Sequence, residues 1–224
     1  PVHHIEGHIC SLYLTYEELE PPFLCLVVSG GHTHIAVVED YGQYRLLGKT
    51  RDDAVGEAFD KTARVLGLGY PGGPKLERLA QKGRPIYSYP RGFKGETHLD
   101  FTFSGLKTAV INHKHQMDQK GEAYDKADIA ASFQAEAIAF LADNTFEAAA
   151  RENIDIIGIA GGVSANGALR EVFRERAQQA GVKLYLPDLR YCTDNAAMIG
   201  CAAAFEPPCS EPLRLNANPG KPLF

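Results

Sequence analysis

The 224-residue sequence has few cysteines, and no two of them form a C-x-x-C pair. Their number is odd and their spacing is wide: Cys10, Cys25, Cys192, Cys201 and Cys209. Cysteines scattered in this way make a poor disulfide framework and a poor structural zinc site. We therefore expect free thiols in a reducing cytoplasm.

The sequence also lacks a membrane signal and an excess of basic residues. No apolar run approaches the ~20 residues that span a bilayer, and no signal peptide opens the chain, so we expect no membrane partner. A formal net charge of -5 is unusual for a protein that grips a nucleic-acid backbone. An RNA partner would have to meet a local patch or another subunit. Basic candidates, which are more often simply solvated, are Arg51, Lys107, Lys114 and Arg190.

The first residue is Pro1 rather than methionine, and a histidine motif follows within three residues. A natural chain rarely starts inside such a dense polar motif, so we expect a fragment. With 45% hydrophobic residues, the chain is still long enough to bury one sizeable core.

Apolar patterning predicts strands and helices in the first half of the chain. The run Phe23 to Val28 is continuous and apolar, as in a buried strand, and two further strands form an antiparallel meander with it. The predicted segments are strands at 23–28, 34–39 and 44–49, helices at 55–66 and 76–80, and an irregular excursion from 83 to 103.

The second half predicts a strand–helix–strand unit after a long helix. One face of that helix carries Ile129, Phe133, Ala137 and Leu141. The predicted segments are a helix at 125–152, a strand at 154–159, a helix that ends near Gly181, a strand at 183–186 and a last helix from Asp194 into 202–204. The segment after Pro207 is predicted to be loosely ordered.

Two histidines near the start have the spacing of metal ligands. On a helix, His4 and His8 share one face, as a divalent metal requires. Glu6 lies midway and projects elsewhere, unlike the glutamate of H-E-x-x-H metalloproteases. The alternative is a pair of surface histidines, so a third ligand is needed. Asp194 is the best candidate, although the local sequence alone favours a helix N-cap for it.

Two glycine pairs follow predicted strands. Gly30 and Gly31 stand between Ser29 and Thr33, and Gly161-Gly162 precedes Asn166 at a helix entrance. Glycines let backbone N–H groups approach a phosphate closely, and a helix N-terminus favours anions. Either pair alone could serve packing; both together suggest a duplicated nucleotide-binding fold.

Asp60 lies on the predicted helix at 55–66. Its carboxylate could bind ribose hydroxyls, or it could belong to a solvated face with Lys61 and Arg64 as partners. The residues alone favour the solvated face.

Seven motifs in order give the chain a resemblance to a known family. They are HIEGH at 4–8, VSGGHT at 28–33, DDAVGEAFDK at 52–61, GYPGGP at 69–74, FTFSGLKT at 101–108, GGVSAN at 161–166 and TDN at 193–195. Together they resemble bacterial TsaD, the tRNA adenosine threonylcarbamoyltransferase family once classed as glycoproteases. The resemblance runs nearly end to end.

The resemblance implies an α/β fold of the actin-like, sugar-kinase and heat-shock ATPase (ASKHA) superfamily, ribonuclease H-like, with a mixed sheet flanked by helices. Residues 1–20 would be a remnant of the first lobe with the metal histidines. Residues 21–206 would form the second lobe with a helical insertion, and 207–224 the C-terminal tail.

The resemblance also implies the site. His4, His8 and Asp194 would hold one divalent metal, Fe²⁺ by preference or zinc; two histidines and a carboxylate suit either. No side chain is assigned as a catalytic acid or base. Substrate contacts would come from Val27, Val28, Ser29, Gly30, Gly31, Asp60, Gly73 and Asn166. His32 and Glu77 would be further contacts, Glu77 standing where relatives often carry aspartate.

The implied reaction transfers a threonylcarbamoyl group from threonylcarbamoyl-AMP to N6 of adenosine 37 in tRNAs that read ANN codons. Implied partners are tRNA, a TsaB-like paralogous subunit and a TsaE-like P-loop ATPase. Family members carry a first lobe of about a hundred residues before the histidine motif. We therefore expect this chain alone to bind the adenylate weakly and to leave tRNA unmodified.

Three alternatives stay open. A hydrogenase-maturation carbamoyltransferase shares the implied fold and a histidine pair, but the 69–74 and 101–108 motifs favour TsaD. A non-catalytic docking module is a second alternative, which the presence of both histidines opposes. A protease is the weakest, because no Ser–His–Asp order or zincin motif is present.

Overall fold

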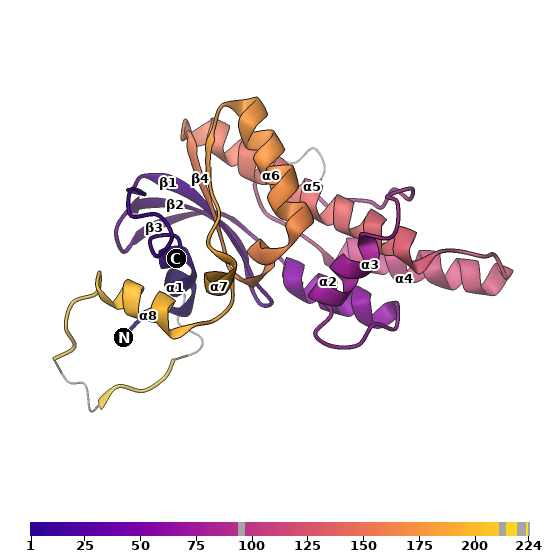
Figure 1. Cartoon of the computed structure of the whole chain (residues 1–224), viewed down its shortest axis with the longest axis horizontal. Coiled ribbons are helices and arrows are strands. Elements are labelled where there is room, and N and C mark those ends of the chain that lie inside the picture. Colours follow the sequence, from indigo (N-terminus) through magenta and orange to yellow (C-terminus); the bar gives the residue numbers. More distant parts are fainter. Residues whose placement is uncertain (94–96, 211–213, 219–222, 224) are drawn as a thin grey trace.

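A computed structural model describes residues 1–93, 97–210, 214–218 and 223. In this part of the chain, helices flank both faces of a five-stranded mixed sheet (Figure 1). The strands are β1 Phe23–Val28, β2 Thr33–Asp40, β3 Gln43–Lys49, β4 Ile156–Ala160 and β5 Lys183–Tyr185. The helices are α1 His4–Cys10, α2 Val55–Val65, α3 Gly73–Ala80, α4 Ser104–Lys120, α5 Lys126–Glu152, η1 Gly162–Ala165, α6 Gly167–Ala180, α7 Leu189–Cys192 and α8 Ala196–Ala203.

The sheet has the order β3-β2-β1-β4-β5, with β1 at its centre. Strands β1, β2 and β3 pair antiparallel, and β4 is parallel to both β1 and β5. The predicted meander and the predicted strand–helix–strand unit are both found. The sheet therefore combines a hairpin-connected half with a crossover half, and β1 joins them.

Every residue of β1 is buried, because both faces of this strand are covered. Leu24, Leu26 and Val28 pack into a core shared with α2, α5 and α6, whereas Cys25 and Val27 pack into a second core with α1. Side chains alternate between the two faces of a strand, so a continuous apolar run is what a doubly covered strand requires.

The carboxyl ends of β1 and β4 lie side by side, with Val27 opposite Ala160. A Cβ atom at Gly161 would come within 2.4 Å of the Val28 carbonyl oxygen, and the φ angle of Gly161 is +93°. Only glycine fits such a close approach in this backbone conformation. The loops that follow the two strands, 29–32 and 161–166, therefore emerge next to each other, where ligands bind in open α/β sheets.

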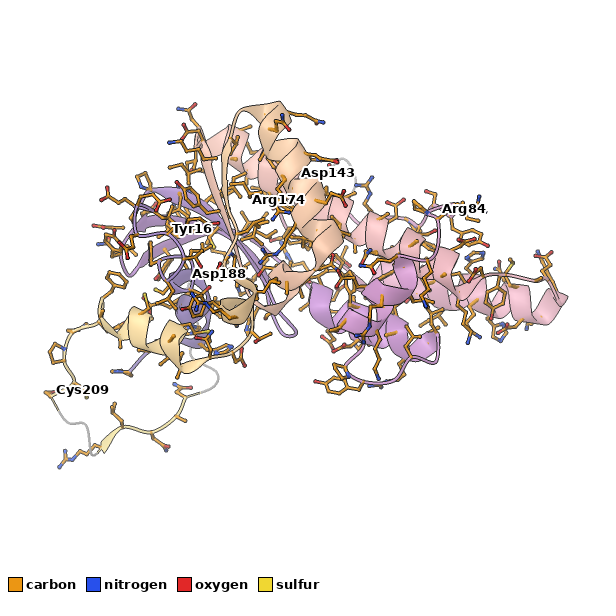
Figure 2. The ribbon with its side chains drawn as sticks, viewed as in Figure 1. Tyr16, Arg84, Asp143, Arg174, Asp188 and Cys209 are labelled. Carbon is orange, nitrogen blue, oxygen red and sulfur yellow. The ribbon has the colours of Figure 1, made fainter. Side chains whose placement is uncertain are left out.

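Helices α5 and α6 cover one face of the sheet. The Asp125 side chain caps α5, the longest of the predicted helices, by accepting a hydrogen bond from Ala127 N. Arg176 of α6 forms an ion pair at 2.6 Å with Asp143 of α5, which is labelled in Figure 2.

Helix α4 was not predicted, because its pattern is barely amphipathic. Only Leu106 and Val110 of its seventeen residues are buried, and the helix extends away from the sheet beside α5 (Figure 1). Asp52 fixes its start by accepting hydrogen bonds from the backbone N–H groups of Phe103 and Ser104. The predicted irregular excursion from 83 to 103 precedes this helix; it has no helix or strand among its described residues, and 94–96 lie outside them.

Helix α1 packs against α8 and against the face of β1 and β4 opposite α5. No helix within the described residues is long and apolar enough to cross a membrane. All five cysteines are free. Of the expected tail, 211–213, 219–222 and 224 lie outside the described residues, and the expected boundaries 1–20, 21–206 and 207–224 stay predictions.

Candidate functional site

A pocket of about 650 Å³ opens where the loops after β1 and β4 emerge. One end, which we call the histidine end, contains His4, His8 and Asp194. The other end, which we call the amide end, contains Asp60, Gly73, Glu77 and Asn166. Ser29, Gly30, Gly31 and His32 also line the pocket.

The histidine end is built on α1. The His3 side chain caps this helix by accepting a hydrogen bond from Ile5 N, so His4 and His8 fall on one face as their spacing predicted. Glu6 projects elsewhere and accepts a hydrogen bond from the Tyr44 hydroxyl at 2.9 Å. Asp194 comes from the distant turn between α7 and α8.

The three side chains converge closely enough to share one cation. The Asp194 Oδ1 atom lies 3.5 Å from His4 Nε2 and 3.3 Å from His8 Nε2. All three donor atoms lie within 4.8 Å of one another. An ion about 2.1 Å from each donor holds tetrahedral ligand atoms about 3.4 Å apart. The donor set and its spacing therefore fit a divalent metal.

The two imidazoles differ in their surroundings. His8 is 1% exposed and His4 48% exposed, while Asp194 is 75% exposed. Burial, together with the positive charge of His4, lowers the pKa of His8, which favours the neutral imidazole that metals bind. The Nδ1 atom of His8 is buried and has no hydrogen-bond partner among the described residues, so Nε2 is its one engaged nitrogen.

The interpretation of Asp194 as a helix cap is wrong. Helix α8 begins at Ala196, and its cap is Asn195, whose side chain accepts a hydrogen bond from Met198 N at 2.9 Å. The carboxylate of Asp194 is therefore not engaged in capping and faces the two histidines.

The loop after β1 presents backbone to the pocket. The Ser29 hydroxyl accepts a hydrogen bond from His32 N at 3.1 Å, which closes the turn. A Cβ atom at Gly30 or Gly31 would have no neighbour within 4 Å, so both glycines face open space. Val27 and Val28, expected as substrate contacts, lie fully buried in β1 behind the pocket and hold the strand from which the loop emerges.

Asp60 does not belong to a solvated face with Lys61. Its Oδ1 atom accepts hydrogen bonds from the N–H groups of Gly72 and Gly73, at 2.8 and 3.1 Å. Lys61 pairs instead with Asp53 and Glu57. Asp60 therefore anchors the glycine-rich loop before α3 through one of its two carboxylate oxygens.

Glu77 and Asn166 likewise accept hydrogen bonds from backbone N–H groups. Glu77 accepts a hydrogen bond from Gly167 N at 2.7 Å. Asn166 caps α6 by accepting one from Leu169 N at 2.9 Å, and it donates one to the Gln134 side chain at 3.0 Å. The amide end is therefore fixed by side chains that bind backbone N–H groups from α3 and α6.

The motifs at 52–61 and 101–108 have a structural role, because they bind each other. Asp52 caps α4, whereas Asp53 accepts hydrogen bonds from Lys61 and Lys107.

The basic residues considered as RNA contacts form ion pairs. Besides Lys107 with Asp53, these are Arg51 with Asp100, Lys114 with Asp118 and Arg190 with Asp188. None of these pairs identifies an RNA surface.

Three residues that were not predicted as site residues also line the pocket. Phe59 and Thr193 line it directly beside Asp60 and Asp194, and Tyr70, 78% exposed, stands at its edge. All three lie within the motifs at 52–61, 69–74 and 193–195, and this membership is the signal that could have found them.

Comparison with known proteins now identifies the family. The profile of TsaD, tRNA N6-adenosine threonylcarbamoyltransferase, matches residues 1–201. The chain belongs to the TsaD family. The tRNA N6-adenosine threonylcarbamoyltransferase of Clostridium botulinum strain 657 is 50% identical over 206 residues, which are 92% of this chain and 61% of that protein. The corresponding enzyme of Clostridium kluyveri is 49% identical over 219 residues, 97% of this chain and 64% of that protein.

The chain thus spans less than two thirds of the length of these TsaD relatives. Among solved structures, full-length HypF in its phosphate- and nucleotide-bound form superposes with a TM-score of 0.71 at 16% identity, over 91% of this chain and 42% of that one. The HypF of T. kodakarensis gives a TM-score of 0.64 at the same identity, over 91% of this chain and 36% of that one. At such identity the likeness shows the fold alone, and it agrees with the expected ASKHA-type mixed sheet.

Proposed function

We propose that the protein transfers a threonylcarbamoyl group from threonylcarbamoyl-AMP to N6 of adenosine 37 in tRNAs that read ANN codons. The proposal concerns the whole protein, because the chain spans about 61% of its curated relatives. The observation that carries it is the convergence of His4, His8 and Asp194 beside two glycine-rich loops, in a chain of the TsaD family.

We propose that His4, His8 and Asp194 hold one divalent metal, Fe²⁺ by preference or Zn²⁺. Two imidazole nitrogens and one carboxylate oxygen are donors that both ions accept. When bound, the metal would supply a Lewis acid that polarises carbamoyl or phosphate oxygens. The burial of His8 keeps its imidazole neutral for this task.

The remaining contacts follow from the pocket. The open space at Gly30 and Gly31 lets backbone N–H groups approach the adenylate phosphate. The free carboxylate oxygens of Asp60 and Glu77 suit ribose hydroxyls. Asn166 holds the start of α6, whose N-terminus favours a negative charge.

The acceptor amine must approach from the open side of the pocket, with tRNA as the partner that supplies it. A TsaB-like subunit and a TsaE-like ATPase in the cytoplasm complete the proposed system. The net charge of -5 and the ion pairs of the basic candidates favour a tRNA surface shared with a partner subunit.

The test is complementation of a strain depleted of its own TsaD by the complete gene of this protein. Threonylcarbamoyl-adenosine in hydrolysed tRNA is then measured by chromatography. We expect the unchanged gene to restore the nucleoside, and His8→Ala or Asp194→Ala to lower it roughly a hundredfold or more, since each removes a ligand of the polarising ion. His115→Ala, on the exposed end of α4, is the matched control and retains full activity.

A strain depleted of this protein itself tests the first alternative. Loss of active hydrogenase with normal threonylcarbamoyl-adenosine in that strain would favour the hydrogenase-maturation alternative. A purified protein without stoichiometric metal after dialysis would favour a docking module, and it would contradict the proposed role of the histidine end.

A further inference from the structure

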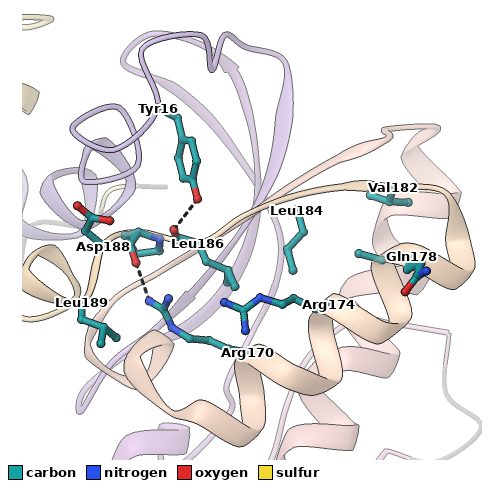
Figure 3. A pocket seen from close by; sticks show the side chains of 11 residues that line it. Tyr16, Arg170, Arg174, Gln178, Val182, Leu184, Leu186, Asp188 and Leu189 are labelled. Carbon is teal, nitrogen blue, oxygen red and sulfur yellow. Dashed lines mark hydrogen bonds between the residues drawn. The ribbon is translucent and has the colours of Figure 1, made fainter.

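Arg170 donates hydrogen bonds to two backbone carbonyl oxygens and one thiol, on segments that lead to the candidate pocket. From α6, its Nε atom donates to the Ser164 carbonyl oxygen at 2.7 Å. Its Nη2 atom donates to the Pro187 carbonyl oxygen at 2.6 Å and to Cys192 Sγ at 3.2 Å. Figure 3 shows the guanidinium directed at the loop before α7, at one side of a second pocket of about 510 Å³.

Each segment that Arg170 contacts leads directly to one wall of the candidate pocket. Ser164 lies in η1, and its neighbours Val163 and Ala165 line the pocket. Cys192 ends α7, and Thr193 and Asp194, which follow it, line the pocket from the other side. One side chain therefore links the wall made by η1 to the wall that carries the carboxylate.

Helix α7 packs against η1, and the Thr193 side chain lies beside Gly162, but among the described residues no direct hydrogen bond joins the turn that carries Asp194 to η1. Its own bonds are local: Cys192 Sγ lies 3.5 Å from the Asp188 carbonyl oxygen, and the Asn195 amide donates to the Thr193 carbonyl oxygen at 2.9 Å. Asp194 itself is 75% exposed. A guanidinium offers several donors in a rigid fork, which lets one residue hold acceptors on two segments at once.

We propose that Arg170 is a positioning residue that couples the two ends of the pocket. It holds the Asp194 turn against η1, so that a nucleotide seated on η1 and the loop after β1 stabilises the turn in the position that binds a metal. Coupling of this kind is reciprocal, so the metal strengthens nucleotide binding by the same factor. The inference rests on the proposed metal site and adds Arg170 to the machinery.

Arg174 provides a matched comparison. It lies one turn further along α6 and lines the same second pocket (Figures 2 and 3), yet it makes no hydrogen bond or ion pair with any residue that the structure describes. Replacement of Arg174 changes the charge of α6 as replacement of Arg170 does, but it leaves the three hydrogen bonds of Arg170 intact.

The experiment uses the protein expressed from its complete gene and stripped of metal with a chelator. Zn²⁺ is titrated calorimetrically with and without saturating AMP, in the unchanged protein and in Arg170→Gln, Arg170→Lys and Arg174→Gln variants. We expect Arg170→Gln to weaken Zn²⁺ binding about tenfold to a hundredfold, as for other residues that orient a ligand, and to abolish the AMP-induced gain in Zn²⁺ affinity. The Arg174→Gln variant should keep both the Zn²⁺ affinity and its increase with AMP. The Arg170→Lys variant should keep only part of each, because one ammonium cannot reach all three acceptors.

The loss of coupling between AMP and Zn²⁺ is the decisive readout. General loosening of the fold would weaken the binding of both ligands without removing the effect of one on the other. Should Arg170→Gln fail to fold, as judged by circular dichroism, Arg170→Lys carries the test. Unchanged Zn²⁺ affinity and unchanged coupling in a folded Arg170 variant would overturn the inference about Arg170 without touching the proposed metal site. Failure of the unchanged protein to bind Zn²⁺ or Fe²⁺ would overturn the proposed metal site and the inference with it.

Discussion

At the amide end of the pocket, Asp60 and Glu77 bind backbone N–H groups of another segment, and Asn166 caps α6 and bonds the Gln134 side chain. At the histidine end, His4, His8 and Asp194 face chiefly one another. The amide end is thus in place before any ligand arrives. At the histidine end, a buried imidazole and an exposed carboxylate meet without such anchors. We infer that folding fixes one end, and that a bound cation would complete the other.

The largest expected difference concerns Asp60. Replacement by alanine leaves the N–H groups of Gly72 and Gly73 without their acceptor, so we expect the free energy of unfolding to fall by about 2 kcal/mol. Asp60→Asn keeps an acceptor oxygen and should lose less than half of that. Urea unfolding of both variants measures the effect. Equal and negligible losses would mean that the amide end is no better anchored than the histidine end.

A smaller effect distinguishes Asp194 from its neighbour. Asn195→Ala removes the cap of α8 and should cost about 1 kcal/mol of stability. Asp194→Ala should cost nothing measurable in metal-free protein, yet it should abolish the additional thermal stability that a metal confers through binding the native state. Thermal unfolding with and without Zn²⁺ tests both variants. A stability loss for metal-free Asp194→Ala as large as that of Asn195→Ala would contradict the assignment.

The smallest effect is a pH dependence that arises from His34 on β2, whose ring lies 5.4 Å from that of His32. Burial and the nearby charge of His32 lower the pKa of His34 to about 4, against 6.5 in an unfolded chain. Between these values the unfolded chain binds the proton and the folded one does not. The stability that His34 contributes is therefore complete above pH 6.5 and is lost as the pH falls toward 4.

His34→Gln should accordingly flatten the decline in unfolding free energy of the metal-free protein between pH 6.5 and 4. His115→Gln, on the exposed end of α4, should leave the decline unchanged. Chemical unfolding at half-unit intervals of pH measures it. A decline of the same slope in His34→Gln would place the acid sensitivity elsewhere.

The sequence predicted well those features that depend on local pattern. The apolar run of β1 gave a buried strand, and Asp125 marked the start of α5. The His4 and His8 spacing gave a shared helix face. The pairing of these histidines with Asp194 came from the resemblance to TsaD, since nothing local connects positions so far apart in the chain.

The features it missed depend on tertiary contacts. Helix α4 buries only two side chains, so its start is determined by Asp52, about fifty positions earlier, rather than by its own pattern. Asp60 resembles a solvated residue until Gly72 and Gly73 are folded against it. Arg170 gave no signal either, because its acceptors are backbone oxygens and a thiol, whose positions no motif encodes.

The glycines around the pocket differ in whether a larger side chain can be accommodated. At Gly161 an added methyl group would collide with β1 and force the tips of the two central strands apart. At Gly30 and Gly31 the same methyl group would meet only the open space of the pocket. Selections for an altered donor molecule should therefore randomise positions 30 and 31 and leave 161 untouched, because the first two shape the cavity while the third keeps the sheet closed.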